Sequence, residues 1–236
     1  MPNKETSNYD LDLDYVIPVI DISKEELKAI IAEAESKIAE NKANSETLAI
    51  AYLKKAQCLQ KIEGDIGYFD ETQCQIKIFI EKAMELSPNM PEAVMQMGKW
   101  YQLNGNLNKA IEMYTRAIRI KPDYAAAFNN RSSVYSSIDL VKAIADSTEA
   151  IRIRPFDAIY YFNRGQKYSA LGEQEKAIAD FSEAIRLRPD LIKALLLRGL
   201  AYSSVGDKNK AKADFDEYLC RKHEMENDET ETLYLP

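Results

Sequence analysis

Apolar residues along most of this chain recur three and four positions apart, which is the spacing of one helix face rather than of a strand. The helical stretches come in pairs, separated within a pair by a short turn such as NGN, LGE or VGD and followed by a Pro. Gly lets the backbone reach the positive φ that stops a helix, and Pro cannot continue a helix regularly. The pattern therefore predicts an all-α protein built from helical hairpins.

One short phrase marks the end of each pair. It reads AMELSPN from Ala83, AIRIKPD from Ala117, AIRIRPF from Ala150 and AIRLRPD from Ala184, at spacings of 34, 33 and 34 residues. A catalytic site is needed once, whereas a phrase repeated at a fixed period is typical of a structural unit that stacks on copies of itself. One hairpin cannot bury its own apolar face, but stacked copies can.

Small and aromatic residues also recur at fixed places in each unit. A small residue on the first helix lets two helix axes approach closely, and we expect an aromatic side chain from the second helix to fill the space beside it. The small residues are Gly98, Ser132, Gly165 and Gly199, and the aromatic residues are Tyr114, Phe181 and Phe215, with Ser147 as the exception.

These motifs resemble the tetratricopeptide repeat, a unit of 34 residues with small residues at places 8, 20 and 27 and Pro at place 32. Four blocks match in register from Pro91 to about His223, and a divergent fifth covers Ser45–Met90. The resemblance implies a right-handed superhelical solenoid of about five helix-turn-helix repeats, the first divergent, with an extra N-terminal helix. The block that starts at Ala125 lacks the turn Gly and is one residue short, so we expect a tighter turn there.

The predicted organisation has five parts: an acidic segment at 1–22, an N-terminal helix within 23–43, the divergent repeat at 44–90, four repeats at 91–223 and an acidic tail at 224–236. A capping box at Ser23 and Glu26 predicts that the N-terminal helix begins near residue 24 and ends near residue 40. The divergent repeat should hold helices at about 46–62 and 73–86. The tail is expected to be mobile, and no solvating helix is evident after the last repeat.

Charge is concentrated at the two ends of the chain. The net charge is -7, with -5 in residues 1–45, -3 in 221–236 and +1 in 46–220. An acidic chain with neutral repeats argues against nucleic acid as a partner, because phosphate contacts need clustered positive charge. The absence of a signal-like or membrane-spanning run, together with three widely spaced cysteines, predicts a cytoplasmic protein without membrane association.

The sequence contains few residues suited to catalysis or metal binding. The one histidine, His223, is expected on the surface in the final turn of the last helix, and Cys58 and Cys74 lack the clustered partners of a zinc site. The phosphate-loop, dinucleotide and nucleophile-elbow motifs are absent. We therefore predict no catalytic residues, no cofactor, no metal and no enzyme activity. The acidic pairs Asp214 with Asp216 and Glu173 with Glu175 are interpreted as solvated helix charges.

Basic residues near the end of each second helix suit the negative end of the helix dipole. An alternative interpretation is a basic row along one edge that binds an acidic tail or partner. These residues are Arg119, Lys121, Arg152, Arg154, Arg186 and Arg188.

In the family that the chain resembles, the first helix of each repeat lines a concave groove, which implies an adaptor or scaffold that binds a partner peptide or helix there. Asn and Gln both donate and accept, which suits the backbone of an extended peptide. The candidate partner-binding residues are Lys99, Gln102, Asn129, Asn130, Ser133, Phe162, Asn163, Gln166, Lys193, Leu196 and Leu200. The alternatives are a structural protein that self-assembles into a homo-oligomer through its uncapped C-terminal repeat face, and an RNA-binding helical array.

One subfamily captures chaperone C-termini with a clamp for two carboxylates. Of its five places the best frame here provides Asn163 and Lys193, whereas Asn129 and Leu197 occupy places that need a cation. We therefore expect that chaperone tails ending in Glu-Glu-Val-Asp do not bind tightly.

Overall fold

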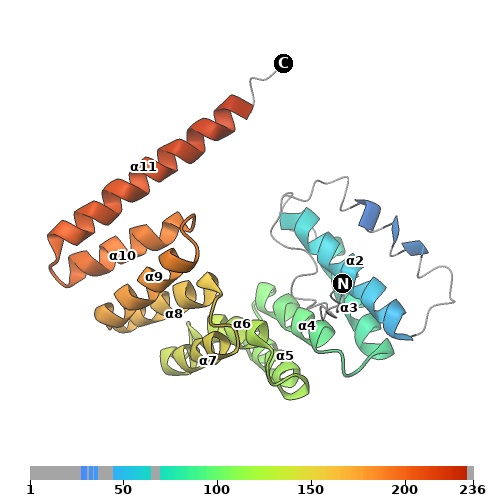
Figure 1. Cartoon of the computed structure of the whole chain (residues 1–236). Coiled ribbons are helices and arrows are strands. Elements are labelled where there is room, and N and C mark those ends of the chain that lie inside the picture. Colours follow the sequence, from blue (N-terminus) through green and yellow to red (C-terminus); the bar gives the residue numbers. More distant parts are fainter. Residues whose placement is uncertain (1–27, 31, 34, 37–44, 65–69, 233–236) are drawn as a thin grey trace, which may run out of the picture. The chain divides into compact units, whose positions relative to one another are not determined.

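The protein is described by a computed structural model that covers residues 28–30, 32–33, 35–36, 45–64 and 70–232. These residues form helices joined by short turns, which confirms the predicted all-α class (Figure 1). The described residues between 28 and 36 are helical, as the capping box predicted, and the ends of that helix lie outside the described ranges. The helices are α2 (Ser45–Gly64), α3 (Asp70–Leu86), α4 (Pro91–Leu103), α5 (Leu107–Ile120), α6 (Ala125–Tyr135), α7 (Leu140–Ile153), α8 (Ala158–Leu171), α9 (Gln174–Leu187), α10 (Ile192–Ser204) and α11 (Lys208–Thr232).

The chain divides into two compact units, Met1–Pro122 and Asp123–Pro236. The first unit contains the hairpins α2–α3 and α4–α5, and the second contains α6–α7, α8–α9 and α10–α11. The two helices predicted for the divergent repeat are confirmed, although the second begins at Asp70 rather than near residue 73. In this hairpin Ala56 lies in one buried cluster with Ile76 and Ile80, so a small residue again faces the second helix.

Each predicted contact between a small residue and an aromatic ring is confirmed. A Cβ atom on Gly98 would lie 2.6 Å from Cε1 of Tyr114, and one on Gly165 would lie 2.8 Å from Cε1 of Phe181. Gly199 has the same relation to Phe215, at 2.6 Å. The ring therefore occupies the volume that any side chain at these glycines would need.

The α6–α7 hairpin has Ser132 and Ser147 in place of the glycine and the aromatic residue. Ser132 Oγ donates to the carbonyl of Ala143 at 2.6 Å and lies 2.6 Å from Ser147 Oγ. Because the Ser132 proton is committed to the carbonyl, Ser147 is the donor in the second bond. Two bonded hydroxyls thus replace the glycine and the ring.

The turns inside the hairpins follow the glycine pattern. Gly105, Gly172 and Gly206 have φ of 73°, 85° and 86°, which places them in the left-handed region. The α6–α7 turn has no Gly, and Asp139 accepts from the backbone N–H groups of residues 141 and 142 at 3.1 Å each, so that it caps α7. Between hairpins, Lys121, which precedes Pro122, is extended with φ -128° and ψ 93°.

The last helix differs from the prediction. α11 continues to Thr232, so residues 224–232 are helical where a mobile tail was expected, and His223 lies inside the helix rather than in its final turn. At His223 the other repeats have a Pro, and the residues that follow contain neither Pro nor Gly before residue 232. With no residue that breaks the helix, the backbone hydrogen bonding continues.

Candidate partner-binding surface

The predicted partner-binding residues all lie on the first helices of the hairpins. Lys99 and Gln102 are on α4, in the first unit, and the other nine are on α6, α8 and α10, in the second unit. In the first unit Gln102 Oε1 accepts a hydrogen bond from the hydroxyl of Tyr114 at 2.8 Å. Burial raises the pKa of Tyr114, so this hydroxyl remains a donor. Gln102 therefore helps to close its own hairpin.

Two of the predicted residues meet in the second unit. Asn163 Nδ2 on α8 donates to Asn129 Oδ1 on α6 at 2.9 Å, across neighbouring hairpins. Phe162, beside Asn163, packs its ring 6.0 Å from the ring of Phe181, the ring that fills the gap at Gly165. The surface of α6 and α8 is thus held by contacts that also build the hairpins.

The remaining residues are more open. Ser133, Gln166, Lys193 and Leu200 are exposed, and Leu200 has a relative exposure of 50%. Asn130 and Leu196 are half-buried. Lys193 makes no hydrogen bond or ion pair with another described residue.

Lys167 is a buried cation that the sequence interpretation missed. It is 6% exposed, and its ammonium donates to the backbone oxygen of Asn163 at 3.0 Å. Burial lowers the pKa of Lys167 to about 8. The same place in the neighbouring hairpins is held by Val134 and Ala201, which are 2% and 1% exposed. The sequence signal for this residue was a lysine at a place where the neighbouring hairpins have apolar residues.

Buried arginine–aspartate pairs correct the interpretation of Asp214. Asp214 is 5% exposed rather than solvated, and Arg198 Nε and Nη2 donate to its two oxygens at 2.9 and 2.7 Å. Its neighbour Asp216 is exposed, as expected. The corresponding pairs are Arg131 with Asp146 and Arg164 with Asp180, in which both bonds are 2.8 Å.

These pairs left a signal in the sequence. Arg and Asp occur together at the same two places in three hairpins, whereas the α4–α5 hairpin has Met97 and Met113 there, in one apolar cluster. The joint replacement of both residues indicates that they are partners. A carboxylate on the helix side that faces its own hairpin cannot be read as a solvated charge.

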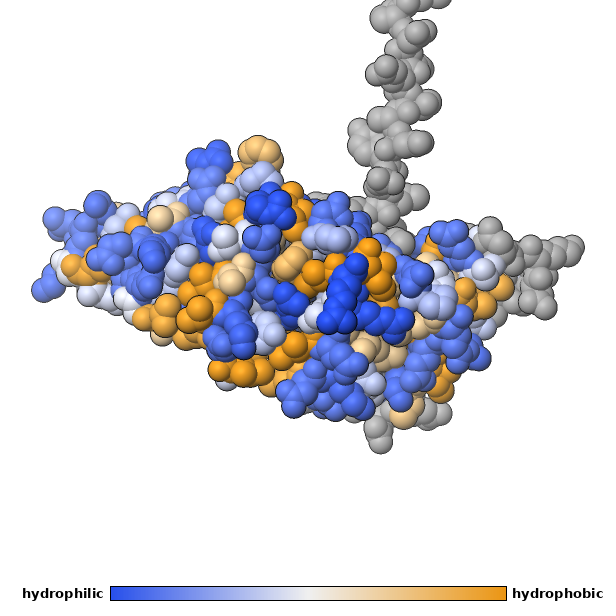
Figure 2. Space-filling model, turned by 90° about the horizontal axis from the view of Figure 1, so that it is seen from below, coloured by the Kyte–Doolittle hydropathy of each residue, from blue (hydrophilic) through white to orange (hydrophobic). Residues whose placement is uncertain are grey.

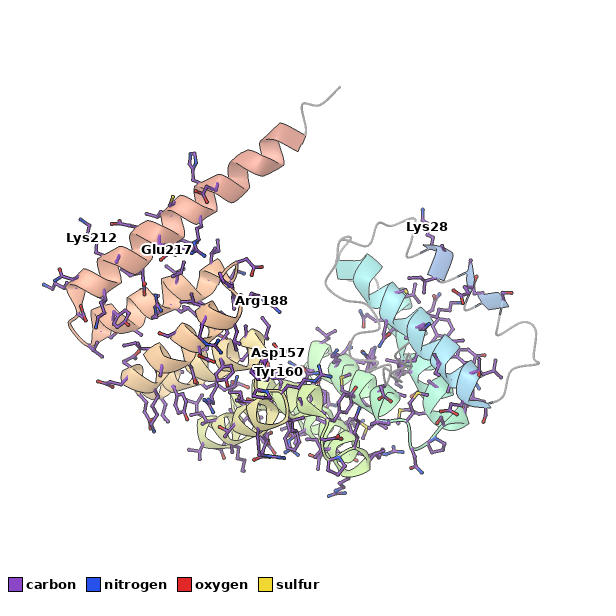
Figure 3. All side chains as sticks on the ribbon, in the orientation of Figure 1. Lys28, Asp157, Tyr160, Arg188, Lys212 and Glu217 are labelled. Atoms are coloured by element: carbon purple, nitrogen blue, oxygen red, sulfur yellow. The ribbon has the colours of Figure 1, made fainter. Side chains whose placement is uncertain are left out.

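Two of the six residues in the predicted basic row pair with neighbouring glutamates. Arg152 bonds Glu149 at 2.8 Å, and Arg186 bonds Glu183 at 2.9 and 2.6 Å. Arg188 is exposed (Figure 3). These pairs favour the interpretation that the basic residues stabilise the helix ends over the interpretation that they form a continuous basic edge for an acidic partner.

The exposed apolar residues are dispersed. On the face in Figure 2, hydrophobic and hydrophilic side chains are interspersed. Among the described residues, the most exposed large apolar side chain belongs to Phe156, at 81%, in the loop between α7 and α8. A helix with the length and apolar character to cross a membrane is not found in the described ranges. The described residues also contain no group of three metal-ligand side chains.

Stacked helical hairpins, each closed by a small residue and joined by the same kinds of contact, define a helical repeat protein. The family model described as TPR repeat matches residues 98–138 and 165–206. These stretches of the chain are tetratricopeptide repeats, as the repeated phrases predicted.

Solved structures share this fold. One of MamA is 26% identical, with a TM-score of 0.62, and the likeness covers 68% of this chain and 99% of that one. One of BtubC from P. vanneervenii is 18% identical, with a TM-score of 0.71 and coverage of 90% and 92%. One of YrrB, described as a TPR protein with an unusual peptide-binding site, is 20% identical, with a TM-score of 0.59 and coverage of 80% and 91%.

A curated relative matches a short stretch. Protein O-mannosyl-transferase TMTC2 from Homo sapiens is 34% identical over 61 residues, which are 26% of this chain and 7% of that protein. The match spans so little of the relative that the transferase activity in its name stays with that protein.

Proposed function

We propose that this protein is a non-catalytic adaptor that holds an extended peptide or helix of a partner protein on the first-helix surface of its second unit. The observation that carries this proposal is the amide pair of Asn129 and Asn163. Asn129 keeps both amide hydrogens and Asn163 keeps its side-chain oxygen without another partner among the described residues. The pair therefore offers a donor and an acceptor to the main chain of a bound segment.

The surface around the pair supplies apolar and charged contacts. Leu200, which is half exposed, can bury an apolar side chain of the partner, and Lys193 can bind a carboxylate. Gln166, exposed on α8, extends the set of amides. The chemistry favours a partner segment that combines main-chain contacts with an apolar and an acidic side chain.

The hairpin contacts supply rigidity. The ring of Phe162 packs near that of Phe181. The side chain of Asn163 binds Asn129, and its carbonyl accepts a hydrogen bond from Lys167. Side chains already held in place lose little entropy on binding, so more of the contact energy contributes to affinity.

The test compares two triple variants of the full chain. The groove variant carries Asn129→Ala, Asn130→Ala and Gln166→Ala. The matched control carries Glu175→Ala, Lys208→Ala and Asn209→Ala, which are exposed residues on the second helices α9 and α11. Circular dichroism and thermal melting first establish that both variants are folded like the parent.

Each protein is then used to capture partners from source-cell lysate, and the captured partner is mapped with overlapping peptides and titrated by calorimetry. We expect the control variant to bind like the parent and the groove variant to lose at least about tenfold in affinity, since two or three polar contacts are removed. Equal binding by all three proteins would contradict the proposal.

A further inference from the structure

Neighbouring hairpins in the second unit are joined by a repeated polar contact. Arg164 Nη1 on α8 donates to Thr148 Oγ1 on α7 at 3.2 Å, and Arg198 Nη1 on α10 donates to Ser182 Oγ on α9 at 3.2 Å. Each hydroxyl donates in turn to the carbonyl four residues before it. The third guanidinium nitrogen thus ties each first helix to the second helix of the preceding hairpin.

The first unit uses the same arrangement at its start. Lys55 on α2 holds the place of these arginines, and its ammonium binds Glu35, in the N-terminal helical residues, at 2.6 Å. A cation of a first helix again finds an oxygen on the helix that precedes it. Here the oxygen belongs to a carboxylate.

An apolar contact accompanies the polar one. Tyr160 and Tyr161 of α8 pack in one cluster with Ile151 of α7, which is 9% exposed. Tyr161 lies three residues before Arg164, and Ile151, in the same cluster, lies three residues after Thr148. The two helices are therefore antiparallel, and each place on one has a definite opposite place on the other.

α11 is the second helix of the last hairpin. Its side that corresponds to the surfaces of α7 and α9 that contact the next hairpin has no helix packed on it among the described residues. We call Lys212, Asp216 and Leu219 the end face. Asp216 stands at the place of Thr148 and Ser182, is exposed and makes no hydrogen bond or ion pair in the described part of the chain. Leu219, at the place of Ile151, is 60% exposed.

Lys212 completes the end face one turn earlier. It stands at the place of Ile144 and Ile178 and projects from α11 away from α10 (Figure 3). The antiparallel register places this position opposite the tyrosine four residues after each arginine, such as Tyr168. A lysine above a tyrosine ring is a contact that the molecule already uses, as for Lys176 and Tyr168 at 5.3 Å.

We propose that the end face docks an α-helix of a partner protein that carries an apolar residue, an Arg three residues later and an aromatic residue four residues after the Arg. The Asp216 carboxylate accepts the guanidinium, Leu219 is covered by the apolar side chain and the Lys212 ammonium lies over the aromatic ring. Replacing a hydroxyl by a carboxylate at the receiving place makes this bond charge-assisted, which suits a partner that must bind without a covalent connection.

The helices α2, α8 and α10 of a second copy are not available to supply this helix. In α8 and α10 the arginines already bind the aspartates of their own hairpins and the hydroxyls of α7 and α9, and Lys55 already binds Glu35. Exposing those faces would require a hairpin to separate from its neighbour. The charge and the pattern of the end face therefore fit a different protein.

The test uses a stapled helical peptide with the sequence of residues 158–171, which has the required pattern in Tyr161, Arg164 and Tyr168, and follows its binding to the full chain by fluorescence anisotropy. We expect a dissociation constant below about 100 µM, weakened at least about tenfold by Asp216→Lys and by Leu219→Ser. A peptide with Arg164→Glu should lose binding to the parent and regain it with the Asp216→Lys variant. Glu175→Lys, an exposed charge reversal on α9, is the matched control and should leave binding unchanged.

Three results would overturn the proposal. They are no binding up to about 1 mM, equal binding by the parent and the Asp216→Lys variant, and loss of binding in the triple groove variant instead, which would place the peptide on the first-helix surface. Sedimentation of the parent alone is the remaining check. A dimer that Leu219→Ser abolishes would show that a second copy occupies the end face. Because the peptide test does not use the groove, it can fail while the adaptor proposal stands.

Discussion

At the scale of single residues, the unusual feature of this molecule is a lysine where its repeats otherwise bury an apolar side chain. The Lys167 ammonium uses one hydrogen for the Asn163 carbonyl and makes no ion pair within the described residues. Burying a cation without a counter-charge disfavours the protonated form, which is why the pKa falls. The same burial means that this lysine reduces the stability of the fold at neutral pH.

Lys167→Met should therefore stabilise the protein at pH 7, by about 1–3 kcal/mol. The folded pKa of about 8 is below the ordinary value of 10.5, so the folded state releases the proton first. The free energy of unfolding of the parent should then rise between pH 8 and 10.5, where only the unfolded chain holds the proton, and be lowest below pH 8. The variant should lack this rise.

Urea unfolding at several pH values measures the difference between the parent and the Lys167→Met variant. The control is Lys208→Met, which changes an exposed lysine and should leave the pH dependence as in the parent. A variant at position 167 that is less stable than the parent at pH 7 would show that the ammonium is better solvated than its burial indicates.

At the scale of the helices, the hairpins α8–α9 and α10–α11 each have two contacts between their helices, one steric and one ionic. The steric contact places a glycine against a ring, and the ionic contact pairs a partly buried Arg with a buried Asp. Both kinds of contact join residues about sixteen positions apart in the chain, so each can be tested by one substitution and a matched control.

Gly165→Ala should destabilise the protein by about 1–3 kcal/mol, because the added Cβ would lie 2.8 Å from the Phe181 ring. In a Phe181→Leu background the same change should cost less, since the smaller side chain leaves room. The coupling between the two substitutions, measured by thermal unfolding in a double-mutant cycle, checks the steric cause. Additive effects would argue that the Phe181 ring is not the cause of the destabilisation.

Asp214→Ala should cost about 3–5 kcal/mol, because it leaves the partly buried guanidinium of Arg198 without its carboxylate. Asp216→Ala, two residues along the same helix, should change the free energy of unfolding by less than about 0.5 kcal/mol, since Asp216 is exposed. Chemical denaturation of the two variants side by side measures the difference. Similar values for both would mean that the buried pair contributes no more than a surface charge.

At the scale of the whole molecule, the two candidate surfaces have different chemistry and so should select different partners. The surface of α6, α8 and α10 offers amides with an apolar residue and a lysine, and the end face offers a carboxylate beside a leucine. Under the two proposals, one protein holds two partners at once, as a scaffold does. Fold alone does not name those partners.

Peptides that end in Glu-Glu-Val-Asp should not bind the full chain tightly. Two places that need a cation for the clamp are held by Asn129, whose side chain binds Asn163, and by Leu197. Isothermal calorimetry with such a peptide should give a dissociation constant weaker than about 100 µM. A constant near 1 µM would mean that other residues of the surface replace the missing anchors.

Much of the architecture was predictable because it follows from local spacing. The repeated Pro, the turn glycines and the pairing of small and aromatic residues each act within one hairpin, so their periodicity alone identified the helices and the family. No helix was predicted after His223, whereas α11 continues to Thr232 because the residues between them contain neither Pro nor Gly.

The sequence by itself determined the hairpins, the repeat period and the family, because these depend on residues that are close along the chain. Only the tertiary structure decided which polar residues face a neighbour. It paired Asp214 with Arg198, buried Lys167 beside Asn163 and left Asp216 open on α11. The physical reason is that side chains one or two positions apart on a helix point in different directions, so packing, and not composition, sets whether a charge is buried, paired or available to bind.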